Sequence, residues 1–436
     1  IQISLPDLRD QRRIAAELDE QLSAIDEARR AAERRVAAAE ALEAALFREL
    51  FHGLSPVMIG LPKDAAPAAW KWTRLLGLAD LESGHTPSRR HPEWWGGDIP
   101  WLALPDIRAL DGKVVMEKEC PEHGFFKDVV FSDVKLYLKM EEWQFGDQRG
   151  LMNPHVTDAV ECPTDCGLCN LHLSHSGLAN VDLTNRCNLT CPVCFANANA
   201  AGYLYEPSIE QVRQMLLNLR GELPVSGRIV QFSGGEPTIY PHFFEAVRIA
   251  KECGFSHVQV ATNGIKFTDL EFAQKAKEAG LHTLYLQFDG VTDDVYLRTR
   301  GERLMEKKLK AIENVRKVGM KICLVPTIVK GINDHQVGDI LRTAIDNIDV
   351  LSAISFQPVS FTGRISRHEL MAKRYTQADF AHAVHQQTGI CDPYEDWFPL
   401  SCVQPFSKLL SALRGEMTTH LSSHPHCAIG TYLFVS

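Results

Sequence analysis

Three closely spaced cysteines constrain this chain more than any other feature of its sequence. Cys187, Cys191 and Cys194 form the pattern C-x3-C-x2-C and come just after the apolar run Leu178–Leu183. Soft thiolates suit iron–sulfur chemistry, so the three sulfurs predict ligands to three irons of a cubane [4Fe–4S] cluster. The loop offers no fourth cysteine, and we expect the fourth iron to be open to a substrate or cofactor, as in catalytic metal sites. A zinc knuckle or three unrelated thiols is the alternative for this spacing taken alone.

A second motif, FSGGEP at residues 232–237, follows another apolar strand-like run. Its glycine pair allows the backbone to approach a ligand closely, and the Glu236 carboxylate can accept from an ammonium group. In order and spacing, the cysteine loop and this motif resemble the radical S-adenosylmethionine (SAM) superfamily. The resemblance implies that the three cysteines are catalytic. It also implies that the amino end of SAM is held by Gly234, Gly235 and Glu236, with Pro237 completing the motif.

Between residues 178 and 360, apolar and β-branched runs alternate with helical patterns. Six such alternations predict an α/β fold in which a parallel sheet curves into a partial (β/α)6 barrel. The strand-like runs are Leu178–Leu183, Arg228–Phe232, Ser256–Ala261, Thr283–Phe288, Lys321–Ile328 and Ser352–Pro358. The helical segments lie near Ile209–Leu219, Phe243–Glu252, Leu270–Ala279, Glu302–Val318 and Gln336–Asn347.

Polar residues follow the carboxyl ends of these predicted strands, where parallel α/β folds place their sites. We expect five of them to reach the ribose of SAM or the substrate, namely Asn263, Gln287, Asp289, Thr327 and Gln357. The alternative is that they cap strand ends and turns, since loops need such residues in any case. Two further cysteines of this region, Cys253 and Cys323, are interpreted as ordinary core residues.

Composition limits the class of protein. Hydrophobic residues make up 45% of the chain and charged residues 23%, which is typical of a soluble globular protein. A net charge of −9 argues against generic nucleic-acid binding. Twelve cysteines, spaced in clusters, favour intracellular metal ligands over disulfides, and no apolar run is long enough to span a membrane. These features predict a cytoplasmic protein. Because the chain starts at Ile1 and ends in a strand-like pattern, we expect it to be part of a longer one.

The first 115 residues contain no cysteine. Residues 14–51 lack Gly and Pro and repeat apolar residues every seven positions, which predicts a long coiled-coil helix within a domain 1–55. The sequence LPDLRDQRRI before this helix, and GHTPS and WWGGDIPW after it, resemble type I restriction-modification DNA specificity subunits. The resemblance implies a spacer helix and a partial target-recognition domain at 56–115. DNA and restriction-modification subunits would be partners only if this fragment functions. An ordinary helical extension is the alternative, and we place the junction with the following region near Asp111–Val115.

Cysteine-rich segments flank the predicted barrel. Within residues 116–177, the C-x3-C-x2-C spacing recurs and predicts an auxiliary iron–sulfur cluster, with ligands Cys162, Cys166 and Cys169. A zinc site completed by His172 is the alternative. Cys120 begins CPEHG, half of a metal knuckle, but no cysteine precedes it, so it is interpreted as an orphan. Three later cysteines, within residues 361–436, resemble a second auxiliary-cluster region: Cys391, Cys402 and Cys427.

Residues 116–436 resemble the radical SAM branch that contains the archaeal tetraether lipid synthases. The motifs that carry this resemblance include CPTDCGLCNLHLSHSG, NRCNLTCPVCFANAN, FSGGEPTIYPHF and SFQPVSFTGR. It implies cleavage of SAM to a 5′-deoxyadenosyl radical, hydrogen abstraction from an unactivated methyl group, and carbon–carbon coupling of two isoprenoid lipid tails. An auxiliary cluster could hold the first alkyl radical through sulfur. The implied cofactors are a catalytic [4Fe–4S] cluster, one or two auxiliary [4Fe–4S] clusters and SAM. The implied partners are a lipid or other small-molecule substrate, a ferredoxin- or flavodoxin-type electron donor, and the membrane surface.

Two other functions stay open. One is a radical SAM methyltransferase acting on a pterin-like small molecule, which a narrow polar pocket would favour over a long apolar groove. The other is a non-enzymatic DNA-specificity subunit, which binding to methylase and nuclease subunits would favour.

Overall fold

The computed structural model describes residues 107–120, 124–143, 150–160, 165, 167–172, 176–361, 369–415, 419 and 423–435. The predicted coiled coil at 1–55, the predicted recognition fragment up to residue 106, and Cys162 and Cys166 lie outside these described residues.

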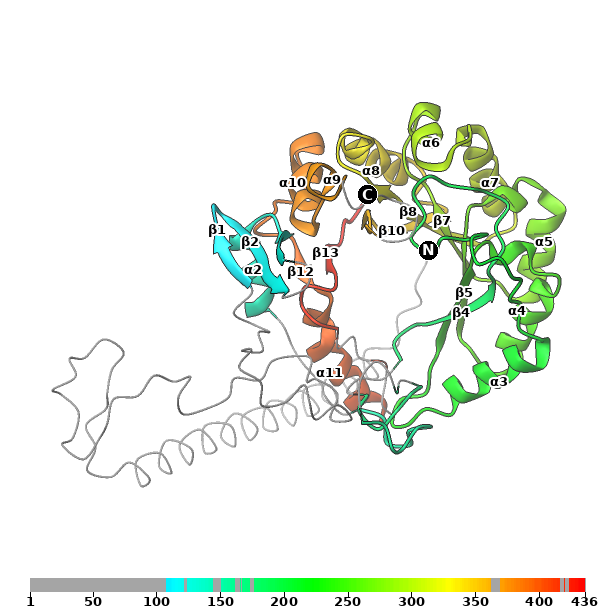
Figure 1. The fold of residues 1–436 in the computed structure, drawn as a ribbon. Coiled ribbons are helices and arrows are strands. Elements are labelled where there is room, and N and C mark those ends of the chain that lie inside the picture. The colour runs from blue at the N-terminus through cyan, green and yellow to red at the C-terminus, as the bar shows by residue number, and fades with distance from the viewer. Residues whose placement is uncertain are drawn as a thin grey trace, which may run out of the picture. The chain divides into compact units, whose positions relative to one another are not determined.

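A six-stranded parallel sheet forms the centre of the described chain, with strand order β10-β8-β7-β6-β5-β4. The strands are β4 (Ala179–Thr184), β5 (Ile229–Gly234), β6 (His257–Thr262), β7 (Thr283–Gln287), β8 (Lys321–Val325) and β10 (Leu351–Ile354). Figure 1 shows the sheet curving, with helices along its outer side. Apolar residues of the strands, such as Val181 and Val230, alternate with polar ones, such as Asn180 and Gln231, so one face of the sheet packs in the core and the other carries polar side chains. The strands are parallel because helices connect each one to the next. The predicted α/β partial barrel is confirmed.

The α-helices between these strands each bury some of their side chains. They are α3 (Ile209–Arg220), α4 (Phe243–Glu252), α5 (Leu270–Ala279), α6 (Asp293–Arg300), α7 (Met305–Lys317) and α8 (Val337–Asp346). Five of them match predicted helical segments, and α6 was not predicted. Its sequence DDVYLRTR is mostly polar and buries only Val295, Tyr296 and Thr299, so the apolar periodicity that reveals a helix is weak.

Two predicted strands are each divided in the structure. The run Lys321–Ile328 forms β8 and then β9 (Thr327–Ile328), with Pro326 between them. Proline has no N–H to donate to a ladder, and its carbonyl instead accepts from Gln357 at 2.9 Å. The run Ser352–Pro358 likewise forms β10 and then β11 (Gln357–Pro358), which pairs with β9. The polar residues that follow β8 and β10 are therefore held in a small second sheet.

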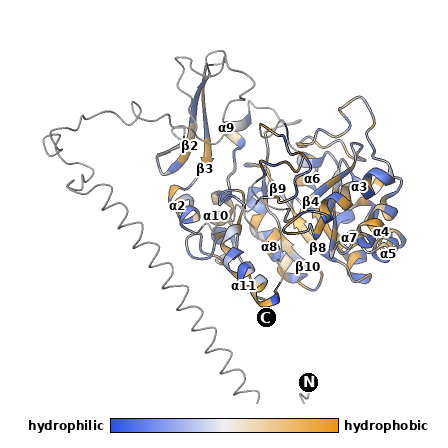
Figure 2. Cartoon of the chain, turned by 90° about the horizontal axis from the view of Figure 1, so that it is seen from below, coloured by the Kyte–Doolittle hydropathy of each residue, from blue (hydrophilic) through white to orange (hydrophobic). Residues whose placement is uncertain are grey.

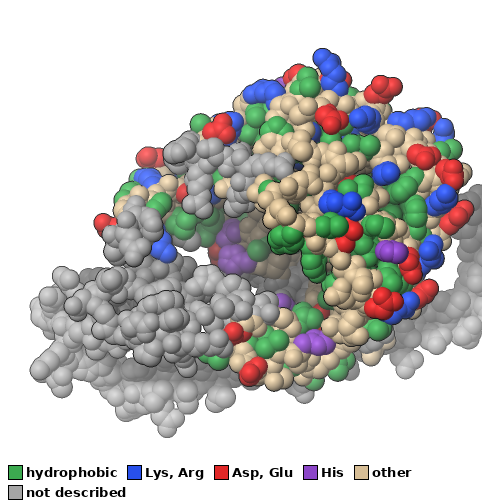
Figure 3. Space-filling model, turned by 45° about the vertical axis from the view of Figure 1, so that its right-hand side comes forward, with side chains coloured by type: hydrophobic (Ala, Val, Ile, Leu, Met, Phe, Trp, Pro, Cys, Tyr) green, Lys and Arg blue, Asp and Glu red, His purple; other side chains and the backbone are tan. Residues whose placement is uncertain are grey.

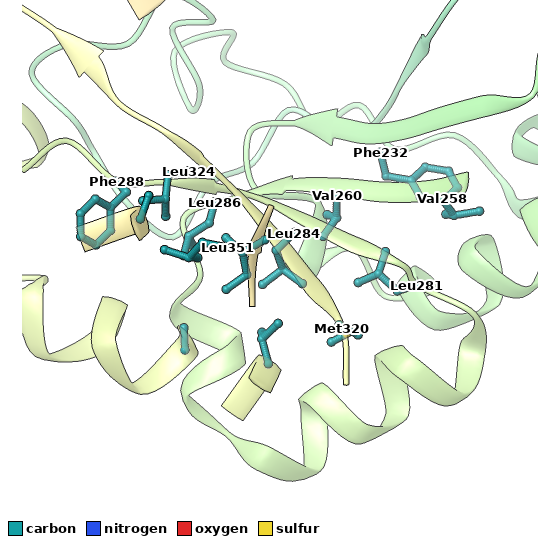
Figure 4. Packing of buried hydrophobic residues seen from close by; sticks show 14 of the residues in the cluster. Phe232, Val258, Val260, Leu281, Leu284, Leu286, Phe288, Met320, Leu324 and Leu351 are labelled. Atoms are coloured by element: carbon teal, nitrogen blue, oxygen red, sulfur yellow. The ribbon is translucent and has the colours of Figure 1, made fainter. Parts of the chain in front are cut away.

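The core lies between the sheet and the helices that cover it (Figure 4). Phe232, Val260, Leu284 and Leu324 come from four neighbouring strands, and none of them is exposed to solvent. Each such side chain contributes roughly 2 kcal/mol of hydrophobic free energy when buried. The hydropathy view shows hydrophobic residues on the strands and on parts of the surrounding helices (Figure 2). This packing fixes the strand ends, from which the site is built.

An antiparallel sheet precedes the barrel and consists of β1 (Ile107–Leu110), β2 (Lys113–Cys120) and β3 (Gly124–Phe131). Val114 and Phe131 are buried in the same core cluster as two residues of α2 (Val134–Glu142). Arg374 holds β3 from the C-terminal part, since its Nε donates to the Val129 carbonyl at 2.9 Å and its Nη2 pairs with Asp128 at 2.8 Å. Apolar burial and one arginine therefore attach this sheet to the rest of the described chain.

The C-terminal part adds α9 (Leu370–Lys373), α10 (Gln377–Thr388), α11 (Gln404–Arg414) and the short pair β12 (Phe398–Pro399) and β13 (Ile429–Gly430). Ala378, Phe380 and Ala381 of α10 join the main core. Within the described residues, no helix combines the length and the apolar character that crossing a bilayer requires.

Candidate active site

The predicted ligand cysteines lie in one loop that leaves the carboxyl end of β4. Cys187, Cys191 and Cys194 are all partly exposed and form no disulfide. The loop is fixed by Asn199, whose Oδ1 accepts from the Cys187 N–H at 2.8 Å and whose Nδ2 donates to the Cys187 carbonyl at 3.0 Å. Asn199 has a φ of +69°, which asparagine tolerates better than most residues. The loop is thus ordered by its own polar side chains.

The Cys187 thiol is perturbed by its surroundings. Burial raises its pKa to about 11, although the Leu189 N–H donates to its sulfur at 3.4 Å and lowers the pKa in part. A metal ligand must be the thiolate, so binding of a cluster here releases a proton.

The glycine pair packs directly on the start of the cysteine loop. A Cβ on Gly234 would lie 2.3 Å from the Thr184 carbonyl oxygen, and one on Gly235 would lie 2.0 Å from that of Arg186. Gly234 also has a φ of +122°. The Gly235 N–H donates to Thr184 at 2.7 Å and the Glu236 N–H donates to Arg186 at 2.8 Å. The sequence predicted that this glycine pair approaches a ligand closely. In the structure, the pair closely approaches the backbone at the start of the cysteine loop.

Glu236 ties the end of β5 to the end of β6. Its carboxylate is buried and accepts from the Thr262 hydroxyl at 2.8 Å and from the Asn263 N–H at 2.8 Å. Burial raises its pKa, and these hydrogen bonds oppose that shift. The Thr238 hydroxyl also donates to it, in the short turn that Pro237 begins. That Glu236 accepts from the ammonium group of SAM stays a prediction.

Asn263 and a buried lysine connect three further parts of the site. Asn263 Nδ2 donates to Asn188 Oδ1, inside the cysteine loop, at 2.7 Å. Lys308 of α7 donates from Nζ to the Asn263 carbonyl at 2.6 Å and to Gln287 Oε1 at 2.7 Å. Burial lowers the pKa of Lys308 to about 7. Gln287 Nε2 is buried without a hydrogen bond of normal geometry among the described residues, while lying close enough to Asp289 to lower the pKa of that carboxyl.

Asp289 and Arg300 form an ion pair between β7 and α6. Asp289 is completely buried, and both of its carboxylate oxygens accept from the Arg300 guanidinium. Arg300 Nη1 also donates to the carbonyl of Val193, which stands between Cys191 and Cys194, at 3.3 Å. Burial opposes the charge of Arg300, but Asp289 and the Cys191 sulfur raise its pKa. Burial likewise opposes ionisation of Asp289, but Arg300 holds its pKa below the usual range.

The last two predicted contacts lie on the small second sheet. The Thr327 N–H donates to Asp289 at 3.0 Å, and its hydroxyl accepts from Arg300 at 3.1 Å. Gln357 is the register partner of Thr327, but its exposed side chain donates to the Tyr285 hydroxyl at 3.0 Å. The structure therefore brings four of the five predicted strand-end residues into one network (Asn263, Gln287, Asp289 and Thr327) and leaves Gln357 at its margin.

Sequence reasoning missed Lys308 and Arg300. For Lys308 a signal existed, because it shares a helical face with Ala311, Ile312 and Val315, all of which are buried. A lysine on an apolar face needs buried hydrogen-bond partners. Arg300 gave no such signal, since it ends a short and mostly polar helix.

Cys169, a predicted ligand of the first auxiliary cluster, lies near the amino ends of the strands, whereas the cysteine loop lies at their carboxyl ends. Cys169 is buried and forms a parallel bridge with Val156. The segment is attached to the connection that leads from α3 to β5: the Met152 N–H donates to the Leu223 carbonyl at 2.9 Å, and the Ser176 hydroxyl donates to Glu222 at 2.8 Å. Both contacts precede the amino ends of β4 and β5. Cys169 is therefore separated from the Cys187 loop by the length of β4.

The later cysteines lie around β12 and β13. The Leu400 N–H donates to the Ala428 carbonyl at 3.1 Å, which brings the segments of Cys402 and Cys427 together. Cys391 interacts with Thr431, just after β13. Within the described residues, no three His, Cys, Asp or Glu side chains converge on a single metal ion. A cubane takes each cysteine on a different iron. The predicted clusters therefore stay predictions.

The described surface is hollowed at its centre, and histidine side chains are visible in the hollow (Figure 3). One cleft, of about 530 Å³, is lined by polar side chains that include Asp133, His335 and His382. None of its lining residues belongs to the cysteine loop.

Sequence models of two known domains match the chain. The radical SAM superfamily matches residues 181–344, and the HMPTM N-terminal zinc ribbon domain matches residues 106–132. The ribbon match and β1 both begin before Asp111–Val115, so this sheet continues across the predicted junction. Within 106–132 the sequence supplies one cysteine, Cys120, and one histidine, His123. Structural zinc takes four Cys or His ligands, so these residues do not fit a complete zinc site.

Curated proteins similar to this chain include two archaeal enzymes. A 7,8-dihydro-6-hydroxymethylpterin dimethyltransferase of Methanocaldococcus jannaschii is 48% identical over 330 residues, covering 76% of this chain and 65% of that protein. A probable GTP 3′,8-cyclase of Sulfolobus acidocaldarius is 27% identical over 180 residues, covering 41% of this chain and 56% of that protein. The chain thus spans 65% and 56% of the length of these two relatives. The comparisons do not show the tetraether lipid synthase branch or the restriction-modification resemblance of residues 1–115.

Solved structures similar to the chain include Streptococcus suis SuiB bound to S-adenosylmethionine, with a TM-score of 0.39 and 18% identity over 50% of this chain and 45% of SuiB. Methylornithine synthase (PylB) has a TM-score of 0.40 and 15% identity over 58% of this chain and 75% of its own. Residues 181–344 of this chain form a radical SAM domain, which implies a [4Fe–4S] cluster and SAM as its cofactors.

Proposed function

We propose that this chain is the radical SAM part of an enzyme that transfers methyl groups to a reduced pterin. The observation that carries the proposal is the 48% identity over 330 residues to a 7,8-dihydro-6-hydroxymethylpterin dimethyltransferase. Because the chain spans 65% of that relative, the substrate is carried over as a proposal. Coupling of lipid tails, the first expectation from the sequence, has no comparable support. Methyl transfer to a pterin, the alternative to it, is therefore preferred.

The residues of the cysteine loop fit the cluster that a radical SAM domain implies. Cys187, Cys191 and Cys194 supply three partly exposed sulfurs from one loop, and the Leu189 N–H already donates to one of them. When bound, the cluster and SAM supply the one-electron cleavage of a carbon–sulfur bond. We propose a ferredoxin- or flavodoxin-type protein as the electron donor.

The chain's own residues position the cofactors. The glycine pair and Glu236 hold the cysteine loop against the ends of β5 and β6. Lys308 fixes the side chain of Gln287 at the end of β7, and we propose that Gln287 contacts SAM. The remaining predicted contacts with SAM or substrate are part of the proposal: Gly234, Gly235, Glu236, Pro237, Asn263, Asp289, Thr327 and Gln357.

The proposal is tested by product analysis. The chain is reconstituted anaerobically with iron and sulfide and incubated with SAM, a strong reductant and 7,8-dihydro-6-hydroxymethylpterin. We expect a pterin product heavier by one or two methyl groups, detected by mass spectrometry, and none from Cys187→Ala. A parallel incubation contains an isoprenoid ether lipid. Joined lipid tails together with unmodified pterin would overturn the proposal in favour of lipid coupling.

A further inference from the structure

The buried ion pair of Asp289 and Arg300 lies against the ligand loop of the cluster. Asp289 follows β7 and is fully buried, and the side chain of Arg300, the last residue of α6, is 11% exposed. Burial of an ion pair is unfavourable unless the geometry is good and the remaining donors and acceptors are satisfied. Both conditions are met here, because three elements supply partners.

Asp289 is held in a single orientation. Besides Arg300, its carboxylate accepts from the Thr299 hydroxyl at 2.9 Å and from the Thr327 N–H at 3.0 Å. Its backbone carbonyl accepts from Asn333 Nδ2 at 2.8 Å. The carboxylate therefore fixes the guanidinium and is itself fixed by β9 and α6.

The guanidinium directs its remaining donor to the cysteine loop. Nε and Nη2 engage Asp289, Nη2 also reaches the Thr327 hydroxyl, and Nη1 donates to the Val193 carbonyl. Val193 belongs to the CPVC segment, and the guanidinium also interacts with the Cys191 side chain. A guanidinium carries its charge at any physiological pH. Val193, which lies between the ligand positions Cys191 and Cys194, is thus hydrogen-bonded to the fixed positive charge of Arg300.

The charge has a consequence for any cluster bound here. Reduction adds one electron, so the reduced cluster is more negative than the oxidised one. A fixed positive charge nearby stabilises the reduced form, and net charge and hydrogen bonding are known determinants of iron–sulfur potentials. The carboxylate of Asp289 acts in the opposite direction, but the guanidinium stands between it and Val193.

We propose that Arg300 is a positioning residue that holds the Cys191–Cys194 segment and raises the reduction potential of the cluster bound there. The proposal rests on the cluster of the radical SAM domain and not on the pterin substrate. It assigns to Asp289 the role of fixing Arg300 and partly compensating its charge.

The test compares Arg300→Gln, Asp289→Asn and Arg316→Gln in the reconstituted full chain. Arg316 is the matched control, since it forms the same kind of pair with Asp349 on the exposed surface. Iron and sulfide contents are measured first. The potential is then titrated with dithionite and followed by electron paramagnetic resonance, and the site's signal is recognised by its change when SAM is added. No pterin is present, so failure here is distinct from failure of the proposed function.

We expect the midpoint potential to shift to more negative values in Arg300→Gln and to more positive values in Asp289→Asn, with Arg316→Gln unchanged. If Arg300 had a purely structural role, the midpoint potentials of Arg300→Gln and Asp289→Asn would shift in the same direction or would not shift. Either result overturns the proposal. If one of these variants retains no iron, the sign of the shift in the other decides. If neither retains iron, Arg300→Lys decides: a wild-type potential supports the role of the charge, and a negative shift contradicts it.

Discussion

The C-x3-C-x2-C spacing occurs twice in the sequence, and the described residues of the two segments lie at opposite ends of the strands of one sheet. The Cys187–Cys194 loop leaves the carboxyl end of β4, whereas the segment that contains Cys169 precedes its amino end. The six residues of β4 place the two edges about 20 Å apart, at 3.3 Å per residue. The shared spacing allows the same kinds of metal in both segments. The place of each segment relative to the strands specifies what the bound group can reach.

The surroundings of the two segments differ accordingly. The carboxyl edge carries a buried network of charged and polar side chains that reaches the loop through Asn263 and Arg300. The amino edge holds Cys169 by a backbone bridge and by contacts to the connection after α3. This placement argues against the hypothesis that a cluster bound by Cys169 holds a substrate radical formed beside Cys187.

The largest contrast is expected between cysteine variants of the two segments. Cys187→Ala should abolish reductive cleavage of SAM, because the loop then holds two of its three ligands. Cys169→Ala should lower the iron content but leave SAM cleavage measurable, since its site lies at the other edge. Iron analysis and chromatography of 5′-deoxyadenosine check both. Equal loss of cleavage in the two variants would contradict separate roles for the two segments.

The contact between the glycine turn and the cysteine loop predicts the next effect. Gly235→Ala places a Cβ 2.0 Å from the Arg186 carbonyl and should destabilise the fold by about 3 kcal/mol, with loss of cluster iron. Gly202→Ala is the matched control: its φ is +73°, but nothing lies within 4 Å, so about 1 kcal/mol is expected. Urea unfolding and iron content are measured. Gly235 itself has no positive φ, so destabilisation of Gly235→Ala no greater than that of Gly202→Ala would contradict the requirement for close contact with the loop.

Lys308 should make the free energy of unfolding depend on pH. Its pKa is about 7 in the folded chain against a usual value of 10.5, so between these values the unfolded chain binds more protons. The free energy of unfolding should therefore rise with pH across this window, by up to about 1.4 kcal/mol per pH unit. Denaturant unfolding at several pH values from 7 to 10 checks this. Lys308→Met should remove the rise, and Lys310→Met, at an exposed position of the same helix, should keep it.

The smallest effect is expected at the amino edge. Glu222→Gln weakens the acceptor of two Ser176 hydrogen bonds and should cost about 1 kcal/mol, with faster hydrogen exchange in residues 150–160. SAM cleavage should stay at the wild-type level. Glu278→Gln, at an exposed position of α5, is the control. A loss of SAM cleavage in Glu222→Gln would show that the two edges are coupled.

Sequence patterns predicted the barrel well because apolar strands and amphipathic helices alternate plainly. They failed at α6, whose polar sequence hides the helix that carries Arg300. They also located the cysteine loop and the polar residues at the strand ends. They could not pair Asp289 with Arg300, or Asn263 with Asn188, because these contacts depend on how neighbouring loops fold over the strand ends. The role of the glycine pair was similarly hidden, since its closest neighbours are backbone atoms of the cysteine loop.

The central claim is that the open iron which binds SAM belongs to the cysteine loop at the carboxyl edge. Electron paramagnetic resonance of the reduced protein, recorded with and without SAM, tests it in Cys169→Ala and Cys187→Ala. We expect SAM to change the spectrum of Cys169→Ala and to leave that of Cys187→Ala unaltered. A response to SAM in Cys187→Ala, or no response in an iron-containing Cys169→Ala, would show that the open iron does not belong to the cysteine loop.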